Sequence, residues 1–377
     1  MSKKICIFPN DPLQAYFDKG ELKERYYNPD NFFDEIHFIS FIEQDIEVEK
    51  IQKIAGRAKV KIHSVGKISI RKRKKYLDSI LDLVTKINPD VIRAYNPLLE
   101  GWFAANCAKE LKIPLFVSLH TQYDENRKIS KKNNLKKFLA LKYTEKIIEP
   151  FVLKNADRIT GVYKIIEPYV KKHTSKKMEL LYNKVDCKKF QSGSKIDELP
   201  NPLILSVGNL TVLKNHALLI DAMQNIDANL LIIGNGEQFS ELNIMIDKLN
   251  LENKIKIIKS VPHDKIQNYF KSATIFALAF NPEIESLPMP VMEAMATGLP
   301  IVIPYPKKGF SEGLENVVLF SERNSIDFSK NIQKILKDSE LTKILSIKSL
   351  EKSIEYDSYK NEIKEAKIYQ ELIKLKK

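Results

Sequence analysis

Two carboxylates lie eight positions apart in the segment PEIESLPMPVMEAMATGLPIVIP, which spans residues 282–304. Glu285 precedes a proline-containing turn, and the pattern that follows predicts a short helix from Pro290, with Glu293 in its first turn and Gly298 at its end. A helix N-terminus offers free N–H groups and partial positive charge, so it can bind a phosphate. A carboxylate would repel that phosphate but accepts hydrogen bonds from sugar hydroxyls. The segment therefore indicates a nucleotide-sugar site, although acids near a helix start are also common as simple dipole partners.

A second candidate anion site precedes this segment, in LSVGNLTVLKNHALLIDAM at residues 205–223. The pattern predicts a strand, a turn at Gly208 and a helix, and Lys214 lies close to the predicted helix start. A cation there can meet a phosphate, although a lysine on an exposed helix turn is usually just solvated. The similar turn IIGNGEQFSEL at residues 232–242 lacks the complete G-x-G-x-x-G pattern, which favours tight packing over a binding role.

His120 closes the apolar segment PLFVSLH at residues 114–120, so we expect it at the end of a buried strand. A single histidine in that position is often structural, but the carboxyl end of a parallel strand is also where ligands bind. The sequence has no D-x-D pair, no serine nucleophile elbow and no cysteine–histidine pairing in a recognisable context. We therefore predict no metal ion and no cofactor at the site.

The elements that must position these residues alternate between apolar strands and helical patterns, which indicates parallel sheets. A chain of 377 residues suits two domains. Strands are predicted at 4–8, 35–41, 59–65, 90–95, 114–120, 157–162, 179–183, 203–208, 229–234, 254–258, 274–280, 300–304 and 317–320. Because residues 190–202 are rich in Gly, Ser, Pro and charge, they are the linker candidate. The predicted fold is α/β, with Rossmann-like doubly wound domains at 1–195 and 196–355 facing across a cleft, and a helix at 356–377.

The formal net charge is +13, and basic residues cluster at RKRKK (71–75), KKNNLKK (131–137) and KKHTSKK (171–177). Two explanations remain open: a solvated lysine-rich surface, or attraction to an anionic membrane surface or a phosphate-bearing acceptor. No basic stretch is interleaved with aromatic residues, so nucleic acid is not an expected partner.

The three cysteines, Cys6, Cys107 and Cys187, have no metal or redox spacing, which is typical of buried thiols in a reducing compartment. No run approaches the ~18 apolar residues of a membrane span. The apolar run near the N-terminus is too short for a signal peptide. We expect a cytoplasmic protein, or one held peripherally at the inner face of the cell membrane.

Taken together, these segments resemble the retaining glycosyltransferases of family 4, which carry an E-x7-E motif and have the GT-B fold of two Rossmann-like domains. The order and spacing of the motifs make the resemblance specific, above all in the second half of the chain. The motifs are NADRITGV (155–162), LLYNKVDCKKF (180–190), SVGNLTVLKNH (206–216), IIGNGEQFSEL…LNLENKIKII (232–258), VPHDKIQNYFKSATIFAL (261–278) and ESLPMPVMEAMATGLPIVIP (285–304).

The resemblance implies roles for individual positions. Glu285 would bind hydroxyls of the donor sugar near the reaction centre, and Glu293 would hold the ribose hydroxyls. Lys214 would neutralise the diphosphate, which would also meet the backbone at Ser286 and Leu287.

Three further roles follow from the same resemblance. Val261 would contact the base through its main chain, and His120 would lie beside the sugar from the first domain. The loop at Gly208 and Asn209 would belong to the donor site. The final helix would cross back onto the first domain.

The sequence also departs from the family pattern. Asn209 stands where the family has a basic residue, and Ser286 stands where it has a glycine. The segment PKKGFSEG (306–313) is an altered form of the loop that faces the phosphates. The paired glycines of the first loop are absent from residues 8–27, where Gly20 is the remaining candidate for acceptor contacts.

These observations predict a retaining, metal-independent glycosyltransferase. It would move a hexose-type unit from a nucleoside-diphosphate sugar to a lipid-linked or polysaccharide acceptor in cell-envelope glycan synthesis. A catalytically inactive binding or partner subunit with the same fold is the main alternative, favoured by Asn209 and the missing glycines. A nucleotide-sugar epimerase and, from charge alone, a nucleic-acid binder are further alternatives that product and binding assays separate.

Overall fold

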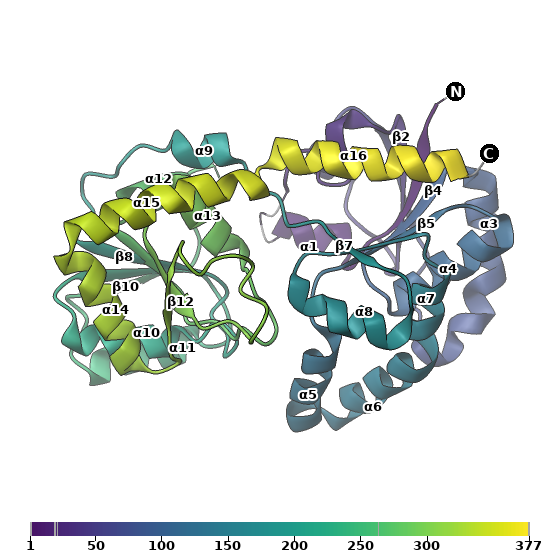
Figure 1. Ribbon diagram of the computed structural model, residues 1–377. Coiled ribbons are helices and arrows are strands. Elements are labelled where there is room, and N and C mark those ends of the chain that lie inside the picture. Colours follow the sequence, from purple (N-terminus) through teal and green to yellow (C-terminus); the bar gives the residue numbers. More distant parts are fainter. Residues whose placement is uncertain (1, 19, 21, 263, 376–377) are drawn as a thin grey trace. The chain divides into compact units, whose positions relative to one another are not determined.

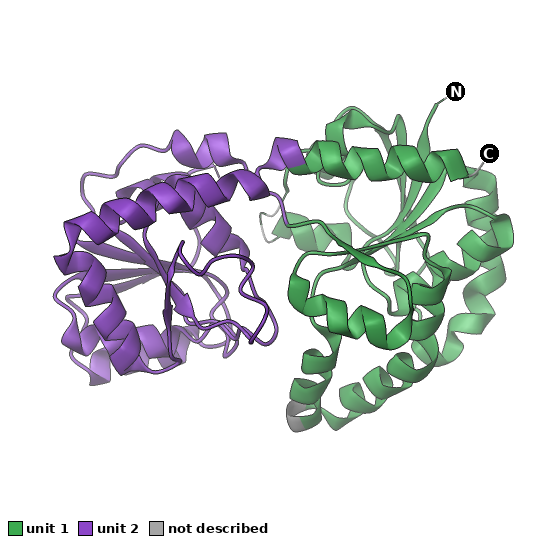
Figure 2. Ribbon diagram, in the orientation of Figure 1, with its two compact units in different colours: residues 1–182, 361–377 green, residues 183–360 purple. Residues whose placement is uncertain are grey.

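The computed structural model describes the chain except for residues 1, 19, 21, 263 and 376–377. The chain forms two compact units, shown in different colours in Figure 2. Unit 1 comprises residues 1–182 and 361–377, and unit 2 comprises residues 183–360. The sequence predicted domain boundaries at 195/196 and 355/356, whereas the structure assigns residues 183–195 and 356–360 to unit 2 as well.

Unit 1 is built on a seven-stranded parallel sheet in the order β3-β2-β1-β4-β5-β6-β7 (Figure 1). Its strands are β1 (Lys4–Phe8), β2 (Glu35–Ser40), β3 (Lys59–Ser64), β4 (Val91–Ala94), β5 (Leu115–Leu119), β6 (Arg158–Gly161) and β7 (Met178–Leu180). Its α-helices are α1 (Leu13–Asp18), α2 (Val48–Ile51), α3 (Leu77–Ile87), α4 (Leu99–Leu111), α5 (Tyr123–Asn133), α6 (Leu135–Tyr143), α7 (Glu149–Asn155) and α8 (Glu167–His173). Shorter turns are η1 (Pro29–Asn31), η2 (Gln52–Ala55), η3 (Ile70–Tyr76), η5 (Lys164–Ile166) and the π-helical η4 (Thr144–Ile148).

Helices cover both faces of this sheet. Cys6 of β1 lies near Cys107 of α4, whereas its neighbours Ile5 and Ile7 point to the opposite face, in a core that contains Tyr369. Tyr369 belongs to the last helix, α16 (Ser358–Leu375), drawn in yellow in Figure 1. Strands covered on both faces need apolar side chains in both directions, which explains their uninterrupted apolar runs.

Unit 2 has a six-stranded parallel sheet in the order β10-β9-β8-β11-β12-β13. Its strands are β8 (Leu203–Val207), β9 (Asn229–Ile233), β10 (Ile255–Ile258), β11 (Ile275–Ala277), β12 (Ile301–Pro304) and β13 (Leu319–Ser321). Its helices are α9 (Cys187–Gln191), α10 (His216–Ala222), α11 (Phe239–Lys248), α12 (Ile266–Ser272), α13 (Met289–Thr297), α14 (Ser325–Lys337) and α15 (Ser339–Ser353), with short turns η6 (Met223–Asn225) and η7 (Ile354–Tyr356).

The predicted fold class is confirmed. Each predicted strand overlaps one of the thirteen strands, and both sheets are parallel and carry helices on both faces. Among the described residues, no helix combines the length and the apolar character needed to cross a membrane.

The linker candidate at 190–202 packs against unit 2. Phe190 makes an edge-to-face contact with Phe270 of α12, and the Ile196 amide donates to the Ser272 hydroxyl at 2.8 Å. The Gly and Ser residues of this segment therefore let its backbone lie close to the backbone of α12, because small side chains do not separate the two. Gly193 illustrates this, since a Cβ there would lie 2.7 Å from the carbonyl oxygen of Gln267.

Candidate functional site

Three loops of unit 2 follow parallel strands, so they lie at the carboxyl edge of the sheet. They are residues 208–215 after β8, 234–238 after β9, and 278–288 after β11. Backbone hydrogen bonds join them: the Leu210 amide donates to the Asn235 carbonyl at 2.9 Å, and the Asn281 amide donates to the Leu213 carbonyl at 2.8 Å. The first and third loops carry Lys214 and Glu285, so this bonding fixes both residues relative to the sheet.

The glycines of the second loop serve packing, as the incomplete glycine motif predicted. A Cβ at Gly234 would lie 1.9 Å from the Gly208 carbonyl oxygen, and one at Gly236 would lie 2.4 Å from the Leu210 carbonyl oxygen. Any side chain would push the first loop away from the sheet edge. The two glycines therefore position the loop that carries Lys214. This packing role requires no contact between the glycines and a ligand.

Lys214 and Glu285 form the centre of the candidate site. The Lys214 ammonium lies 2.5 Å from a carboxylate oxygen of Glu285, and the two side chains are 14% and 34% exposed. The methylene carbons of Lys214 pass Gly208, where a Cβ would lie 3.6–3.7 Å from them. The structure thus brings together three residues that the sequence predicted for one site.

This pair has hydrogen-bonding capacity left for a ligand. An ammonium group has three donors and a carboxylate accepts on two oxygens, so one mutual bond leaves groups of both kinds. A ligand that carries an anion close to a hydroxyl matches this arrangement. Partial burial of the pair strengthens its field relative to a fully solvated pair.

The loop before α13 is held by a carboxylate that sequence analysis did not select. The hydroxyl of Ser286 donates to Glu312 at 2.7 Å, and Glu312 is buried with a left-handed backbone (φ 56°). Glu312 lies in the altered segment 306–313, and that departure from the family pattern was the available signal. The backbone amides of Ser286 and Leu287 meet no hydrogen-bond acceptor among the residues that the structure describes, and such amides can bind an anion.

The predicted place of Glu293 within its helix was wrong. Pro288 is the N-cap residue and α13 begins at Met289, so Glu293 is the fifth helical residue and lies in the second turn. The reason is that Pro288 adopts an extended conformation (ψ 147°), after which Met289 can already take helical angles. The predicted end is confirmed, because Gly298 caps the helix in the left-handed region at φ 81°.

A buried histidine, also missed from the sequence, lies next to the Lys214 loop. His216 is fully buried at the start of α10, with Nδ1 3.2 Å from the Ser206 hydroxyl. Burial, followed by the positive charge of Lys214, lowers the pKa of His216 to about 4. The imidazole is therefore neutral at pH 7 and adds no charge to the site.

Asn209 and Val261 lie in loops of unit 2. Asn209 is exposed, and its carbonyl accepts from the Thr211 amide at 2.9 Å. Val261 is half-buried in the segment after β10. Their predicted contacts with a donor stay predictions.

His120 and Gly20 belong to unit 1. His120 follows β5 as predicted, and its ring stacks on Tyr95 with centroids 5.5 Å apart. Burial and then the positive charge of Arg93 lower the pKa of His120 to about 4. Its Nε2 is buried and meets no hydrogen-bond partner among the described residues. Gly20 is exposed in a turn closed by its amide and the Phe17 carbonyl at 2.9 Å, and its acceptor role stays a prediction.

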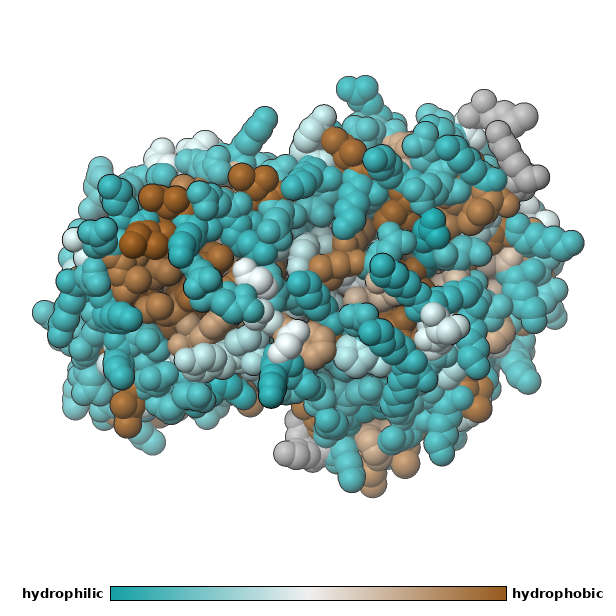
Figure 3. Space-filling view, in the orientation of Figure 1, coloured by the Kyte–Doolittle hydropathy of each residue, from teal (hydrophilic) through white to brown (hydrophobic). Residues whose placement is uncertain are grey.

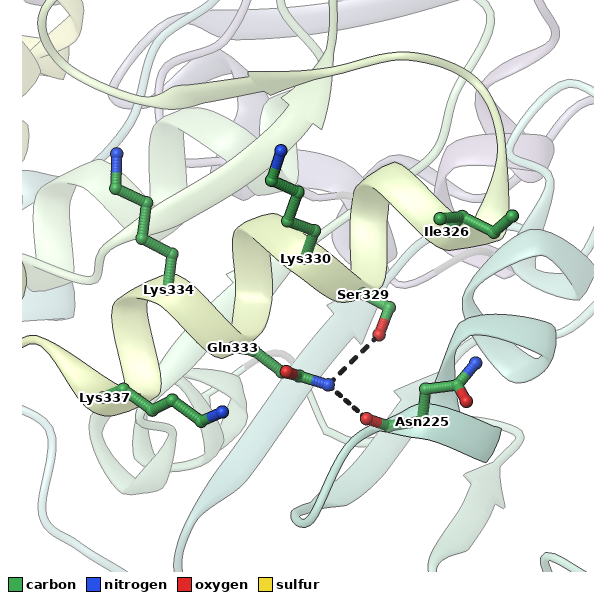
Figure 4. A pocket seen from close by; sticks show the side chains of 7 residues that line it. All are labelled: Asn225, Ile326, Ser329, Lys330, Gln333, Lys334 and Lys337. Carbon is green, nitrogen blue, oxygen red and sulfur yellow. Dashed lines mark hydrogen bonds between the residues drawn. The ribbon is translucent and has the colours of Figure 1, made fainter.

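A groove along α14 contains none of the predicted site residues (Figure 4). The side-chain amide of Gln333 bonds to the Asn225 carbonyl on its floor, while Lys330 and Lys334 extend away from it. Its only aliphatic lining residue is Ile326, so it lacks the apolar walls typical of a small-molecule pocket. In the described part of the chain, no cluster of three or more His, Cys, Asp or Glu residues is arranged to hold a metal ion.

Two family models match the chain. The model described as "Glycosyltransferase Family 4" matches residues 42–189, and the model described as "Glycosyl transferases group 1" matches residues 188–352. The second match contains Lys214, Glu285 and Glu293. The two matches overlap at residues 188–189 and together span most of both units.

Curated relatives agree with these matches. An uncharacterized glycosyltransferase of Haemophilus influenzae is 31% identical over 39% of this chain and 41% of its own length. An N-acetylgalactosamine-N,N'-diacetylbacillosaminyl-diphospho-undecaprenol 4-alpha-N-acetylgalactosaminyltransferase of Campylobacter jejuni is 30% identical over 49% of this chain and 51% of its own length. The alignment thus spans about half the length of these relatives or less.

The fold extends over nearly the whole chain. The solved structure of Alr3699/HepE from Anabaena, determined in complex with UDP, superposes with a TM-score of 0.73 at 14% identity, covering 98% of this chain and 100% of that one. At that identity the likeness shows the fold alone. The structural likeness and the parallel sheets of both units show the GT-B fold, and the two family models show that the chain belongs to the family 4 (group 1) glycosyltransferases.

Proposed function

We propose that this protein is a retaining glycosyltransferase that transfers a sugar from a nucleoside-diphosphate donor to a lipid-linked or polysaccharide acceptor in cell-envelope glycan synthesis. The observation that carries the proposal is the Lys214–Glu285 pair, which offers cation and carboxylate side by side at the carboxyl edge of the unit 2 sheet. The Campylobacter relative is named for transfer to a sugar on diphospho-undecaprenol, which supports a lipid-linked acceptor. The Anabaena protein was solved with UDP, which supports a nucleotide-sugar donor.

In this proposal the donor's diphosphate binds the Lys214 ammonium and the backbone amides of Ser286 and Leu287. Glu285 accepts hydrogen bonds from the sugar hydroxyls, and Glu293 accepts them from the ribose. The bond between the anomeric carbon and the diphosphate breaks, the acceptor oxygen bonds to the same face of that carbon, and the acceptor proton passes to the departing phosphate. The protein contributes mainly electrostatic stabilisation of the leaving group.

The two remaining donor contacts come from loops. Val261 meets the base through its main chain, while Gly208 and Asn209 line the diphosphate. His120 is neutral at pH 7, so it can donate or accept one hydrogen bond beside the sugar without placing a charge there.

We further propose that no divalent metal takes part, because Lys214 and the two amides supply the positive field that a metal would otherwise supply. Turnover should be unchanged by excess EDTA. A loss of turnover that Mg²⁺ or Mn²⁺ restores would contradict this part of the proposal.

The deciding experiment begins with a thermal-shift screen against UDP-, GDP- and ADP-sugars. The best donor is then tested for transfer with membrane extract as the acceptor source, and the product's anomeric configuration is read by NMR. Transfer with retained configuration supports the proposal. Free nucleotide with epimerised sugar and no acceptor product would show an epimerase instead.

The variant Glu285→Gln sharpens this test, because it keeps the size of the side chain but removes the charge near the reacting carbon. Turnover should fall at least a hundredfold, on the scale of losing one oriented charged contact. Affinity for UDP should change little, since UDP lacks the sugar. The matched control is Glu283→Gln, a neighbouring residue on the same loop that pairs with Lys307 at 3.0 Å. Near-normal turnover of Glu285→Gln would sink the proposed role.

A non-catalytic partner subunit is the second candidate, favoured by the exposed, uncharged Asn209 where the family has a basic residue. It predicts nucleotide binding without transfer in every donor and acceptor combination. If Asn209→Arg then raised turnover from zero, the missing charge would be the cause.

A further inference from the structure

The surface of unit 1 carries an exposed apolar stripe along α6 and η4. Leu135, Leu139, Tyr143 and Ile147 follow one another at four-residue intervals and are 64%, 60%, 43% and 51% exposed. That spacing places their side chains along one side of the helix. Hydrophobic residues reach the surface over α6 near the lower edge of Figure 3. We call these four residues the α6 stripe.

The opposite side of η4 and α7 is buried. Glu149 is fully buried and accepts from Arg127 at 2.9 Å, from the Thr144 hydroxyl at 2.7 Å and from the Tyr169 hydroxyl at 2.6 Å. The apolar residues that are fully buried on the same segment are Ile148, Val152 and Leu153. This packing and the hydrogen bonds of Glu149 fix the orientation of the segment, so the exposure of the α6 stripe is built into the fold.

The first basic cluster meets the α6 stripe through Tyr143. The buried Arg73 of η3 donates to the Tyr143 hydroxyl at 2.8 Å, and its guanidinium also lies over the Trp102 ring at 5.0 Å. Its neighbours in the cluster all point to solvent; they are Arg71, Lys72, Lys74 and Lys75. Residues 71–75 are thus anchored beside the stripe.

The cluster at 131–137 runs directly into α6, so its exposed lysines adjoin the stripe. Lys142 and Lys146 are exposed on the same helical segment. The cluster at 171–177 reaches the segment from its inward side, where Lys172 lies 2.5 Å from Glu145. Two clusters that are distant in sequence, 71–75 and 131–137, therefore border the apolar stripe.

We infer that the α6 stripe and the basic clusters at 71–75 and 131–137 form a docking surface for an anionic lipid bilayer. Leucine, isoleucine and tyrosine side chains enter the boundary between headgroups and acyl chains, while the lysines lie along them and place their ammonium groups on anionic headgroups. The inference deepens the proposed function, because a lipid-linked acceptor is presented at such a surface.

The charge of this surface selects the bilayer over the other occupants. A second copy of the chain would bring the same lysine clusters face to face, and like charges at an interface disfavour association. A nucleic acid would satisfy the lysines but leave the apolar side chains exposed to water. An anionic bilayer satisfies both groups at once.

The test is co-sedimentation of the full chain with vesicles of phosphatidylcholine alone or of equal parts phosphatidylcholine and phosphatidylglycerol. We expect binding only to the anionic vesicles. The triple variant Leu135→Ser/Leu139→Ser/Ile147→Ser should bind at least tenfold more weakly, because it loses the inserted side chains. The variant Arg71→Gln/Lys72→Gln/Lys74→Gln should lose about fivefold per removed charge. All six positions are exposed, so folding should be retained, which circular dichroism checks.

The matched control removes three exposed isoleucines from unit 2 in the variant Ile244→Ser/Ile326→Ser/Ile347→Ser. Ile326 is a close match, because it too lies beside lysines on a helix (Figure 4). The control should bind anionic vesicles as the unmodified protein does. Equal loss in control and α6 variants would overturn the inference, as would full binding by the α6 variant.

Two further measurements separate the possible failures. Sedimentation velocity without lipid should show the same species for the unmodified protein and the α6 variant; a dimer that only the unmodified protein forms would identify a second copy as the occupant. UDP binding should be equal in both proteins. Vesicle binding without any UDP binding would contradict the proposed function but not the docking surface. UDP binding without vesicle binding would contradict the docking surface but not the proposed function.

Discussion

Lys214 is the residue whose surroundings say most about the donor site. Its ammonium group lies beside Glu285, and its stem runs along Gly208, so its position is set by the loop rather than by chance rotamers. Each contact is formed within unit 2. At this scale the site consists of one cation, one carboxylate and the backbone that holds them together.

We expect Lys214→Met to weaken UDP binding about 10- to 100-fold, since a hydrogen bond to a charged group contributes roughly 1.5–3 kcal/mol. Stability should change little, because Glu285 is one-third exposed and remains solvated. Isothermal titration calorimetry measures the affinity. Lys352→Met is the matched control, because Lys352 of α15 is 13% exposed and its ammonium group pairs with Glu355 at 2.9 Å. Equal affinities of the two variants would contradict the role of Lys214.

His216 gives the fold a pH dependence. Its pKa is lowered from 6.5 to about 4, so below pH 6.5 the unfolded chain takes up a proton that the folded chain does not. Stability from this residue is therefore fully present above pH 6.5 and is lost as the pH falls toward 4. For this one group the loss between pH 7.5 and pH 5 is about 2 kcal/mol.

In the variant His216→Asn, the difference in the free energy of unfolding between pH 7.5 and pH 5 should be smaller by about 2 kcal/mol. This holds whatever effect the substitution has on stability at pH 7.5. Urea denaturation at both pH values measures it. An unchanged difference between the two pH values would show that His216 is not the titrating group.

At the scale of elements, α16 is fastened to unit 1 by a buried ion pair. Arg93 of β4 pairs with Glu365 and the Tyr369 hydroxyl of α16, and donates to Ser118 of β5 at 2.9 Å. The guanidinium also lies over the Tyr95 ring at 4.3 Å, and Tyr95 in turn stacks on His120. The last helix of the chain therefore supports the ring beneath a predicted site residue of the first unit.

Glu365→Ala should lower the free energy of unfolding by about 3–5 kcal/mol, because it leaves the Arg93 charge buried without a partner. Glu371→Ala on the same helix is the control: its pair with Arg158 is exposed, and its loss should cost at most about 1 kcal/mol. The double variant Arg93→Met/Glu365→Met should recover part of the loss. Urea denaturation measures all three, and similar values for Glu365→Ala and Glu371→Ala would refute the argument.

At the scale of the whole molecule, the net charge of +13 is organised rather than spread evenly. The cluster at 71–75 reaches α6 through Arg73, the cluster at 131–137 leads into α6, and the cluster at 171–177 reaches the inward side of η4 through Lys172. The first two border an apolar stripe, not a groove with aromatic rings on which bases could stack. The distribution of charge thus favours a surface with both anionic and apolar character.

We accordingly expect no measurable affinity for single-stranded or duplex DNA or RNA at physiological salt. Fluorescence anisotropy with labelled oligonucleotides, at low and at physiological salt, measures this. Weak binding at low salt that disappears when salt is added would be the nonspecific effect of the net charge of +13. Affinity that persists at physiological salt would revive the nucleic-acid alternative.

The sequence by itself determined the fold class, because strands buried on both faces require uninterrupted apolar runs and each predicted run contributes a strand. It also marked Lys214 and Glu285 as candidate site residues, and the family resemblance assigned both to one donor site. The incomplete glycine motif was enough to predict packing at Gly234 and Gly236.

Tertiary structure decided the rest, because the deciding contacts join residues that are distant in sequence. The altered segment 306–313 marks the loop of Glu312 as unusual, but only the fold shows that Glu312 accepts from Ser286. Nothing near His216 in the sequence reveals its full burial. The helix start at Met289 depended on the angles of Pro288, so Glu293 moved to the second turn. The meeting of the basic cluster at 71–75 with the α6 stripe required the fold, since only folding brings Arg73 of η3 to Tyr143 of α6.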